Sequence, residues 1–543
     1  NRSARTRPGA LQGALSAMRC RLWLHLAAPV LAGALLPRIS LRLHEDGSGD
    51  RIFVETTPNA DGRARVFHGT NVIVKGPPWL PKRDAYDPLI SLVGEDFEAM
   101  RKAGINLVRL GVMWAGAEPE RGRYNETYFQ ELRGIVEEAA SYGIYVLLDM
   151  HQDLLSERFC GEGIPQWAAQ VPEHESLRFP VPLWPLPAES GDDGFPTRST
   201  CRTILSRNPF FHGWASGHAS YASGLAFEAL YTDGNLTDAW GAFWARTATA
   251  LKGLTNVLGF ELINEPFAGN VYEDPLLMIP GRADEERLQP AYDRVVRRIR
   301  EVDQETLIFF AAVTWDDVYP VGFRRAPGGD AEANRSVLAY HYYTPPQQRG
   351  KFKEYADALR RDARRLGTGL MMTESCCDHF FFEAKPQLDA AGQSWAQWEW
   401  KPMCKEDNVS TQWELQRASF GACKTGYGGI ADNDTEVGHI SAPYAPAVAG
   451  ALTGTSWDSA AGVFELRFLP SADSPLPTEI FVNANLSFPS GFDVQVTPAS
   501  ALEVELRLAD SRVLLTARRG AAAGPAVVQL RRRAASTETL LVY

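Results

Sequence analysis

The sequence predicts an α/β fold, a (β/α)8 or TIM barrel, followed by an all-β domain. Between about residues 45 and 440, short apolar segments rich in β-branched residues alternate with helical segments. Strands joined through helices pair in parallel, because a parallel crossover needs a long connection. Eight such units close into a barrel. The alternative is an open doubly wound sheet, but no glycine-rich phosphate loop follows the first strand.

The elements of the barrel follow from the period of the apolar residues. Helices are expected at residues 96–103, 128–142, 239–251, 290–302 and 355–365. Strands are expected at residues 66–75, 107–112, 145–150, 259–264, 307–311, 337–343, 369–374 and 394–400.

From about residue 441 the helical pattern fades, and short strand-like runs are punctuated by Pro, Gly and Ser. This pattern predicts a small all-β sandwich. We therefore expect a barrel domain at residues 45–440 and a β-sandwich domain at residues 441–543, after an N-terminal extension at residues 1–44. The sandwich strands are expected at residues 462–469, 479–482, 492–496, 502–508 and 526–530.

The N-terminal extension has the pattern of a signal peptide at about residues 18–44. Arg19 and Arg21 precede an apolar run at residues 22–36, which is short for a membrane span of about 20 residues. We expect a soluble glycoprotein that is secreted or resides in the lumen of lysosomes or other endomembrane compartments. Sequons that support this location are at Asn125, Asn235, Asn334, Asn408, Asn433 and Asn485.

Cysteine usage and charge narrow the class of protein further. Cys20 falls within the predicted signal peptide, and the six other cysteines suit disulfides in an oxidising compartment. Many pairings are possible; we expect Cys160–Cys201 across one loop, with the other four paired among themselves. No C-x-x-C pair stands near a second one, so a zinc site is not expected. The net charge of −11 argues against nucleic-acid binding.

The strongest chemical signal is the run Asn264-Glu265-Pro266, which ends the fourth predicted strand. The C-terminal strand ends of a barrel form its active site, so Glu265 is expected to point into the barrel mouth. Glu374 closes the seventh predicted strand in the same way. Two carboxylates about 5–5.5 Å apart are the pair that retaining glycoside hydrolysis requires. Either Glu alone could instead be a charged cap where a strand meets solvent.

Polar and aromatic residues at other strand ends would complete such a site. Arg109 lies within an apolar strand, where an arginine is costly unless it is paired, and Glu374 is its expected partner. Two residues that are separated by one position in an extended segment share one face, and this spacing occurs at two strand ends. A Tyr hydroxyl placed in this way could donate a hydrogen bond to the nucleophile. These strand-end residues are Lys75, His151, Asp153, His341, Tyr343 and Trp398.

With these residues the sequence resembles glycoside hydrolase family 5, and within it the endoglycoceramidases and their glycosylceramidase relatives. The segments that carry the resemblance are residues 109–114 (RLGVMW), 149–153 (DMHQD) and 264–266 (NEP). The resemblance implies that Glu265 is the acid/base and Glu374 the nucleophile. It also implies a substrate-binding set made of Lys75, Arg109, His151, Asp153, Asn264, His341, Tyr343 and Trp398.

The resemblance implies a retaining β-glycosidase that cleaves the bond between an oligosaccharide, or a single sugar, and ceramide in glycosphingolipids. No metal or organic cofactor is expected, and the partner is the glycolipid or oligosaccharide substrate. We further expect a monomer that contacts a membrane or micelle surface transiently. The alternatives are another family 5 β-glycosidase (a β-glucosidase, steryl-glucosidase or endoglucanase-like enzyme) and a catalytically silent glycan- or lipid-binding protein.

Overall fold

In the computed structural model, most of the chain beyond residue 34 is described. The described residues are 35–56, 62–172, 214–314, 320–343, 350–375, 379–401, 440–518 and 524–534, with short stretches between 179 and 201. The predicted signal peptide lies outside them. So do the predicted disulfides among Cys376, Cys377, Cys404 and Cys423, and the sequons at Asn408 and Asn433.

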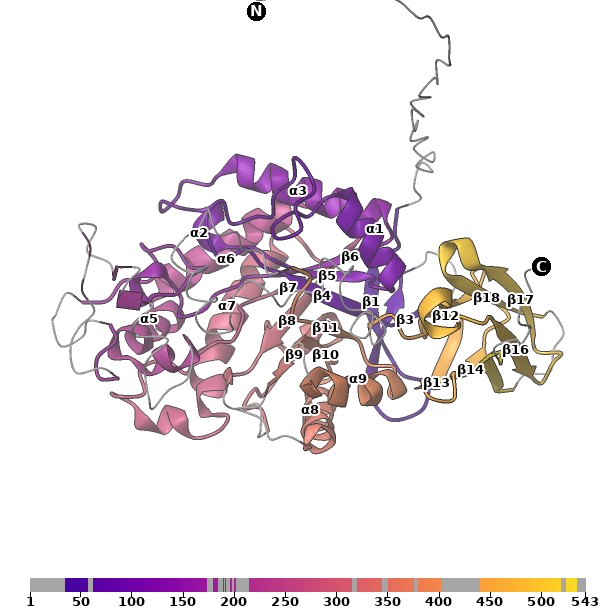
Figure 1. The fold of residues 1–543 in the computed structure, drawn as a ribbon. Helices are drawn as coiled ribbons and strands as arrows, with labels where there is room; N and C mark the ends of the chain where they lie inside the picture. The colour runs from indigo at the N-terminus through magenta and orange to yellow at the C-terminus, as the bar shows by residue number, and fades with distance from the viewer. Residues whose placement is uncertain are drawn as a thin grey trace, which may run out of the picture. The chain divides into compact units, whose positions relative to one another are not determined.

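Eight parallel strands form a closed barrel in the order β10-β11-β4-β5-β6-β7-β8-β9 (Figure 1). This order confirms the predicted barrel, because each predicted strand segment overlaps one barrel strand. The barrel strands are β4 (His68–Val72), β5 (Leu107–Gly111), β6 (Tyr145–Asp149), β7 (Val257–Glu261), β8 (Leu307–Ala311), β9 (Ser336–Tyr342), β10 (Gly369–Ser375) and β11 (Trp395–Gln397).

The helices between these strands surround the barrel, as Figure 1 shows for α1, α3, α6, α7 and α8. Each of the five predicted helices overlaps an observed one. The α-helices are α1 (Gly94–Ala103), α2 (Trp114–Ala117), α3 (Glu126–Ser141), α5 (Tyr221–Thr232), α6 (Gly234–Ala250), α7 (Gln289–Arg300), α8 (Phe352–Leu366), α9 (His379–Ala390) and α12 (Ala484–Ser487). Shorter helical turns are η1 (Glu157–Phe159), η3 (Trp214–Ala219), η4 (Pro275–Met278), η5 (Asp284–Leu288), η7 (Asp330–Arg335) and η8 (Leu508–Asp510).

The N-terminal end of the barrel is closed by the hairpin of β1 (Ile39–Leu43) and β2 (Arg51–Glu55). Phe53 of this hairpin packs edge-on to Phe67, with ring centroids 5.4 Å apart, and stacks on Phe309 of β8 at 6.3 Å. These side chains belong to an apolar cluster that fills the interior of the barrel at this end. Among the described residues, this packing closes one end of the barrel, and a ligand is expected to enter at the opposite end, where the strands terminate.

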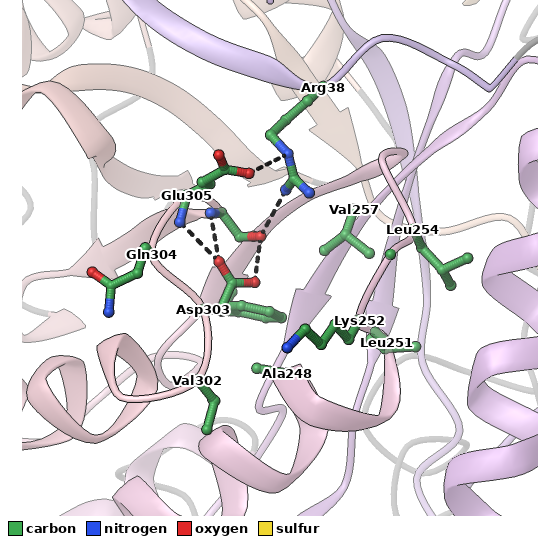
Figure 2. A pocket seen from close by; sticks show the side chains of 13 residues that line it. Arg38, Ala248, Leu251, Lys252, Leu254, Val257, Val302, Asp303, Gln304 and Glu305 are labelled. Atoms are coloured by element: carbon green, nitrogen blue, oxygen red, sulfur yellow. Dashed lines mark hydrogen bonds and ion pairs between the residues drawn. The ribbon is translucent and has the colours of Figure 1, made fainter.

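A shallow cavity at the N-terminal end of β7 and β8 belongs to this closed end (Figure 2). Arg38 lies 3.1 Å from a carboxylate oxygen of Glu305 and donates a hydrogen bond to Thr306. Thr306 in turn donates to Asp303 over 2.7 Å. None of the residues predicted for the active site lines this cavity. Its polar groups tie the segment before β1 to the barrel, a structural role typical of this end of the fold.

Two antiparallel sheets make up the β-sandwich, and one of them recruits strands from both ends of the described chain. The larger sheet has the order β1-β2-β3-β12-β15-β18-β17, and the smaller one has the order β13-β14-β19-β16. Strands that precede the barrel thus join strands that follow it, whereas the predicted limit between domains places them apart. The strands are β3 (Ala64–Arg65), β12 (Tyr444–Val448), β13 (Gly450–Asp458), β14 (Val463–Pro470), β15 (Thr478–Phe481), β16 (Phe492–Thr497), β17 (Leu502–Arg507), β18 (Arg512–Ala517) and β19 (Ala526–Arg532).

One disulfide is present in the described residues, and it is the predicted Cys160–Cys201 bond. It joins the segment after β6 to a point 41 residues further along the chain. Within the described residues, no helix combines the length and the apolar character that crossing a membrane would need.

Gly104 lies where the sandwich packs against the end of helix α1, and a substitution there tests this contact. It ends α1 with φ of 85°, and a Cβ atom there would lie 2.5 Å from the ring of Phe481. Gly143 has a similar φ of 76°, but a Cβ atom added there would meet no heavy atom within 4 Å. A left-handed Ala costs about 1–2 kcal/mol at either site. Only Gly104→Ala adds overpacking of about 1–3 kcal/mol.

We therefore expect Gly104→Ala to lower the melting temperature clearly more than Gly143→Ala does. Thermal unfolding of the two purified variants and the wild type measures this difference. Equal shifts for the two variants would show that the sandwich does not press on α1 at this point.

Candidate active site

Arg109 is the centre of the polar cluster at the C-terminal end of the barrel. Its fully buried side chain donates to both carboxylate oxygens of Glu261 over 2.7 and 3.1 Å and lies 3.1 Å from Asp149. Its Nη1 donates to Oε2 of Glu374 over 2.9 Å, the pairing expected from the sequence. Burial alone would lower the pKa of Arg109, but the charges of Asp149, Glu261 and Glu374 raise it, so the guanidinium stays charged.

Glu374 lies near the end of β10 and is held at both carboxylate oxygens. Oε2 accepts the hydrogen bond from Arg109, and Oε1 accepts one from the hydroxyl of Tyr343 over 2.7 Å. The pairing of β10 with β9 shifts register between Met372 and Glu374, and such a bulge re-aims the side chains at a strand end. Burial and the charge of Glu374 raise the pKa of Tyr343 well above its usual range, so this hydroxyl remains a donor.

The segment between β7 and Glu265 is fixed from two sides. On the outer side, Trp240 and Trp244 of α6 both donate hydrogen bonds to the backbone carbonyl of Leu262, over 3.2 and 3.1 Å. On the inner side, the Gln152 side chain donates to the backbone carbonyls of Asn264 and Glu265, over 2.7 and 3.1 Å. The amide of Asn264 returns a bond to the Gln152 carbonyl over 3.1 Å. This bracing is typical of catalytic groups that must keep one orientation.

Glu265 itself has a left-handed backbone and an electrostatic partner. Its φ of 40° is uncommon for a residue other than glycine and is the kind of local strain that clusters at functional sites. Its Oε1 lies 2.7 Å from Nδ1 of His341. Burial alone would lower the pKa of His341, but the carboxylates of Glu374 and Glu265 raise it to about 9. The 2.7 Å contact therefore joins two groups that can each carry a proton.

The two carboxylates approach each other closely. A carboxylate oxygen of Glu265 and one of Glu374 lie within 4.8 Å of each other. Retaining glycosidases hold their carboxyl groups about 5–5.5 Å apart, whereas inverting ones need about 6.5–9.5 Å to admit a water molecule. This spacing therefore suits an attack by one carboxylate on an anomeric carbon while the other carboxyl group protonates the leaving oxygen.

A second polar group lies on the side of the mouth formed by β4, β6 and β11. Lys75 forms an ion pair with Asp153 and lies 3.4 Å from an oxygen of Glu162. Its ammonium group also lies 4.9 Å from the ring centroid of Trp398, and that ring stacks on His151 at 5.8 Å. Burial alone would raise the pKa of Asp153, but the charge of Lys75 lowers it, so Asp153 is ionised. An indole beside charged groups suits a sugar, which has an apolar face and polar edges.

Two triads bring potential metal ligands within 4.8 Å of one another. One is His151, Asp153 and Glu162, and the other is Glu265, His341 and Glu374. The carboxylates of both triads already contact side-chain cations, namely Lys75, His341 and Arg109. Each of these carboxylates thus already has a cationic contact within the chain, and we assign no metal to either triad.

All ten residues predicted for the site lie in the described part of the chain and fall into these two groups. Two partners of Arg109 were not predicted from the sequence. Glu261 accepts two hydrogen bonds from Arg109, and Asp149 forms an ion pair with it. Glu162 was not predicted either. Burying an unpaired carboxylate in an apolar strand costs free energy, just as burying an unpaired arginine does. The position of Glu261 at the end of the apolar strand β7 was therefore a signal that it pairs with Arg109.

Known proteins match the chain along most of its length. The sequence model described as cellulase (glycosyl hydrolase family 5) matches residues 91–403, and the one described as glycoside hydrolase family 5 C-terminal domain matches residues 443–529. A protein named endoglycoceramidase from Cyanea nozakii is 39% identical over 463 residues, covering 81% of this chain and 85% of the relative. Its namesake from Hydra vulgaris is 38% identical over 446 residues, covering 80% and 81%.

A solved structure shares the fold. Endo-glycoceramidase II from a Rhodococcus species, in a structure described as a ganglioside GM3 complex, superposes with a TM-score of 0.64 at 19% identity, covering 89% of this chain and all of the other. The sequence matches span the barrel and the C-terminal domain alike. On this evidence the chain belongs to glycoside hydrolase family 5.

Proposed function

We propose that this enzyme hydrolyses the β-glycosidic bond between the sugar and the ceramide of glycosphingolipids, with retention of anomeric configuration. The observation that carries the reaction type is the pair Glu265 and Glu374, whose carboxylate oxygens lie within 4.8 Å of each other. The substrate class is supported by the two relatives named endoglycoceramidase, which are 39% and 38% identical over most of both chains.

In the first step, a carboxylate oxygen of Glu374 bonds to the anomeric carbon of the sugar. The bond from that carbon to the ceramide oxygen breaks, and Glu265 gives its proton to this oxygen. Ceramide leaves, and the sugar stays attached to Glu374 as an ester. Arg109 and Tyr343, which hydrogen-bond the free carboxylate of Glu374, orient it for this attack.

In the second step, Glu265 acts as the base. It takes a proton from a water molecule, whose oxygen attacks the anomeric carbon and displaces Glu374. Nδ1 of His341 lies 2.7 Å from Oε1 of Glu265 and can hydrogen-bond the carboxylate that Glu265 becomes between the two steps. Asn264 donates only one of its two amide hydrogens among the described residues, to Gln152, and the other suits the sugar 2-hydroxyl.

The enzyme acts, in this proposal, in a secretory or lysosomal compartment. The Cys160–Cys201 disulfide is supporting evidence, because disulfides persist in oxidising compartments. The four sequon asparagines within the described residues all have exposed side chains, as glycosylation requires. They are Asn125, Asn235, Asn334 and Asn485.

We propose further that the loop that follows Glu265 contacts the lipid surface in which the substrate is embedded. Around the short helix η4, Leu276, Met278 and Ile279 are 49%, 61% and 50% exposed, although they are large and apolar. Between them, the fully buried Leu277 anchors the loop to the protein. The same barrel connection carries Glu265, so this apolar surface lies on the catalytic end of the barrel.

The charged residues beside this apolar surface indicate which kind of lipid bilayer it contacts. The charged residues that flank the apolar surface are mostly acidic, with Glu273 and Asp274 on one side and Arg282 on the other. Electrostatic attraction to anionic lipids is therefore weak, and the contact depends on apolar burial. An uncharged or zwitterionic bilayer that contains the glycolipid fits this surface.

The substrate class is tested by incubating the enzyme with ganglioside GM3, glucosylceramide, a steryl glucoside and a cello-oligosaccharide. We expect ceramide and an intact oligosaccharide from the ganglioside, with the β-anomer released first in proton NMR. Action on the cello-oligosaccharide alone would instead favour a second candidate function, endoglucanase activity. This candidate is supported by the family model that matches the barrel, which is described as a cellulase. Release of the α-anomer would exclude the retaining mechanism.

The roles of the two carboxylates are distinguished by aryl β-lactosides that differ in leaving-group acidity. Glu265→Gln removes proton donation and should slow cleavage of a poor leaving group by about 10²–10⁴-fold. With dinitrophenol, which needs no proton, the first step should be nearly unaffected. Glu374→Gln should abolish turnover of both substrates. Equal losses with both leaving groups in Glu265→Gln would remove the acid role from Glu265.

The lipid contact is tested by the triple substitution Leu276→Ser, Met278→Ser and Ile279→Ser. We expect roughly tenfold lower activity on ganglioside in phosphatidylcholine vesicles, from lost apolar burial, and unchanged activity on a soluble aryl lactoside. Serine at Val504, Leu506 and Leu508, which are similarly exposed on the sandwich, is the matched control. An equal loss of activity on the vesicles in both triple variants would contradict the lipid contact. So would a wild-type protein that is a dimer and that the substitutions at Leu276, Met278 and Ile279 convert to a monomer, because the apolar surface would then be a subunit interface.

A further inference from the structure

Glu399 is a buried carboxyl group for which the catalytic steps above have no use. It follows Trp398 beyond the end of β11, and its side chain is only 5% exposed. Its chain neighbour Trp400 donates a hydrogen bond to Asp96, and Lys401 forms an ion pair with the same Asp96 over 2.5 Å. Among the described residues, the carboxyl group of Glu399 has no hydrogen bond or ion pair of its own.

Glu399 directly follows Trp398, whose ring lies 4.9 Å from the ammonium group of Lys75 at the barrel mouth. Lys75 and Glu374 are the two groups whose charges influence it, one from each side of the candidate site. Lys75 is already paired with Asp153 and close to Glu162, so it is shared among carboxylates. Glu399 is therefore close enough to both polar groups of the site to be influenced by their charges, and among the described residues it has no counterion of its own.

A buried carboxyl group without a partner is expensive, and a fold retains one where something else satisfies it. Leaving such a group unsatisfied costs about 1–3 kcal/mol, and more if it is ionised. Burial raises the pKa of Glu399 well above its usual range; the charge of Lys75 opposes this shift, and the smaller influence of Glu374 adds to it. Glu399 is thus held as the neutral acid, which offers one hydrogen-bond donor and one acceptor to a ligand.

We propose that Glu399 is a specificity-determining residue that hydrogen-bonds vicinal hydroxyl groups of the sugar ring lying against Trp398. The neutral acid donates to one sugar oxygen and accepts from the neighbouring hydroxyl, while the indole covers the apolar face of the ring. The inference rests on the proposed function only in placing a sugar in the barrel mouth, and it holds for any pyranoside that the enzyme cleaves.

The deciding variant is Glu399→Leu, which keeps the volume and removes both hydrogen-bonding atoms. Replacing an unpaired buried acid by an apolar side chain should leave the melting temperature unchanged or raise it. We expect kcat/KM for a soluble aryl β-lactoside to fall by about 10–100-fold, chiefly through KM, since a hydrogen bond to the sugar is lost. Glu399→Gln, which keeps a donor and an acceptor, should stay within a few-fold of wild type.

The pH profile gives an independent readout. The titratable groups that face this part of the mouth are Lys75, His151, Asp153, Glu162 and Glu374. Glu399 becomes negative beside Glu374 as the pH rises through its raised pKa, and this should raise KM in the wild type at high pH. Glu399→Gln cannot ionise, so its KM should stay flat over the same range. Glu137→Ala, on the exposed face of α3, is the surface control.

The proposal fails if Glu399→Leu lowers the melting temperature and leaves KM unchanged, because the group would then be structural. It also fails if Glu399→Gln lowers kcat/KM for the aryl lactoside as much as Glu399→Leu does. Both outcomes are read with the aryl lactoside. They are therefore independent of the ganglioside assay, in which a lack of ceramide release would count against the proposed substrate class alone.

Discussion

The site depends on one buried guanidinium. Arg109 has no exposed surface, and three carboxylates on three other elements approach it within 3.1 Å. Removing one partner of such a cluster leaves an uncompensated buried charge, which costs about 3–5 kcal/mol. The ion pairs therefore hold β5, β6, β7 and β10 in a fixed relation at the barrel mouth. The position of Glu374 is a consequence of this cluster, because one of its two oxygens is bound to Arg109 itself.

The same cluster explains why the two glutamates can have different roles. Glu374 accepts hydrogen bonds from Arg109 and from the Tyr343 hydroxyl, one at each carboxylate oxygen. Glu265 faces His341, a group that can itself gain or lose a proton, and it is held on a strained backbone outside the Arg109 cluster. Distinct environments for two acids are the condition for one to act as nucleophile and the other as proton donor.

Much of the barrel and most of the site could be predicted from the sequence, because both depend on local patterns. Apolar runs locate parallel strands, and polar residues at their C-terminal ends meet at the mouth wherever a barrel closes. The pairing of β3 with β12, in which Arg65 faces Ala447, has no local signal, since strands joined over such a distance can pair with many partners. Glu162 and Glu399 were missed for a related reason. They lie in irregular segments, where spacing does not tell which way a side chain points.

The division between strands and loops also bears on substrate choice. The chemistry of glycosidic cleavage needs only the residues at the ends of β5, β7, β9 and β10, which any retaining member of this family could use on any β-glycoside. What is particular to a glycolipid is an oligosaccharide on one side of the broken bond and a lipid on the other. In the proposed function, Lys75, Trp398 and Glu399 contact the first, and the exposed apolar residues around η4 contact the second. Changes in these two regions should therefore alter which substrate is cleaved while the Arg109 cluster still supports cleavage.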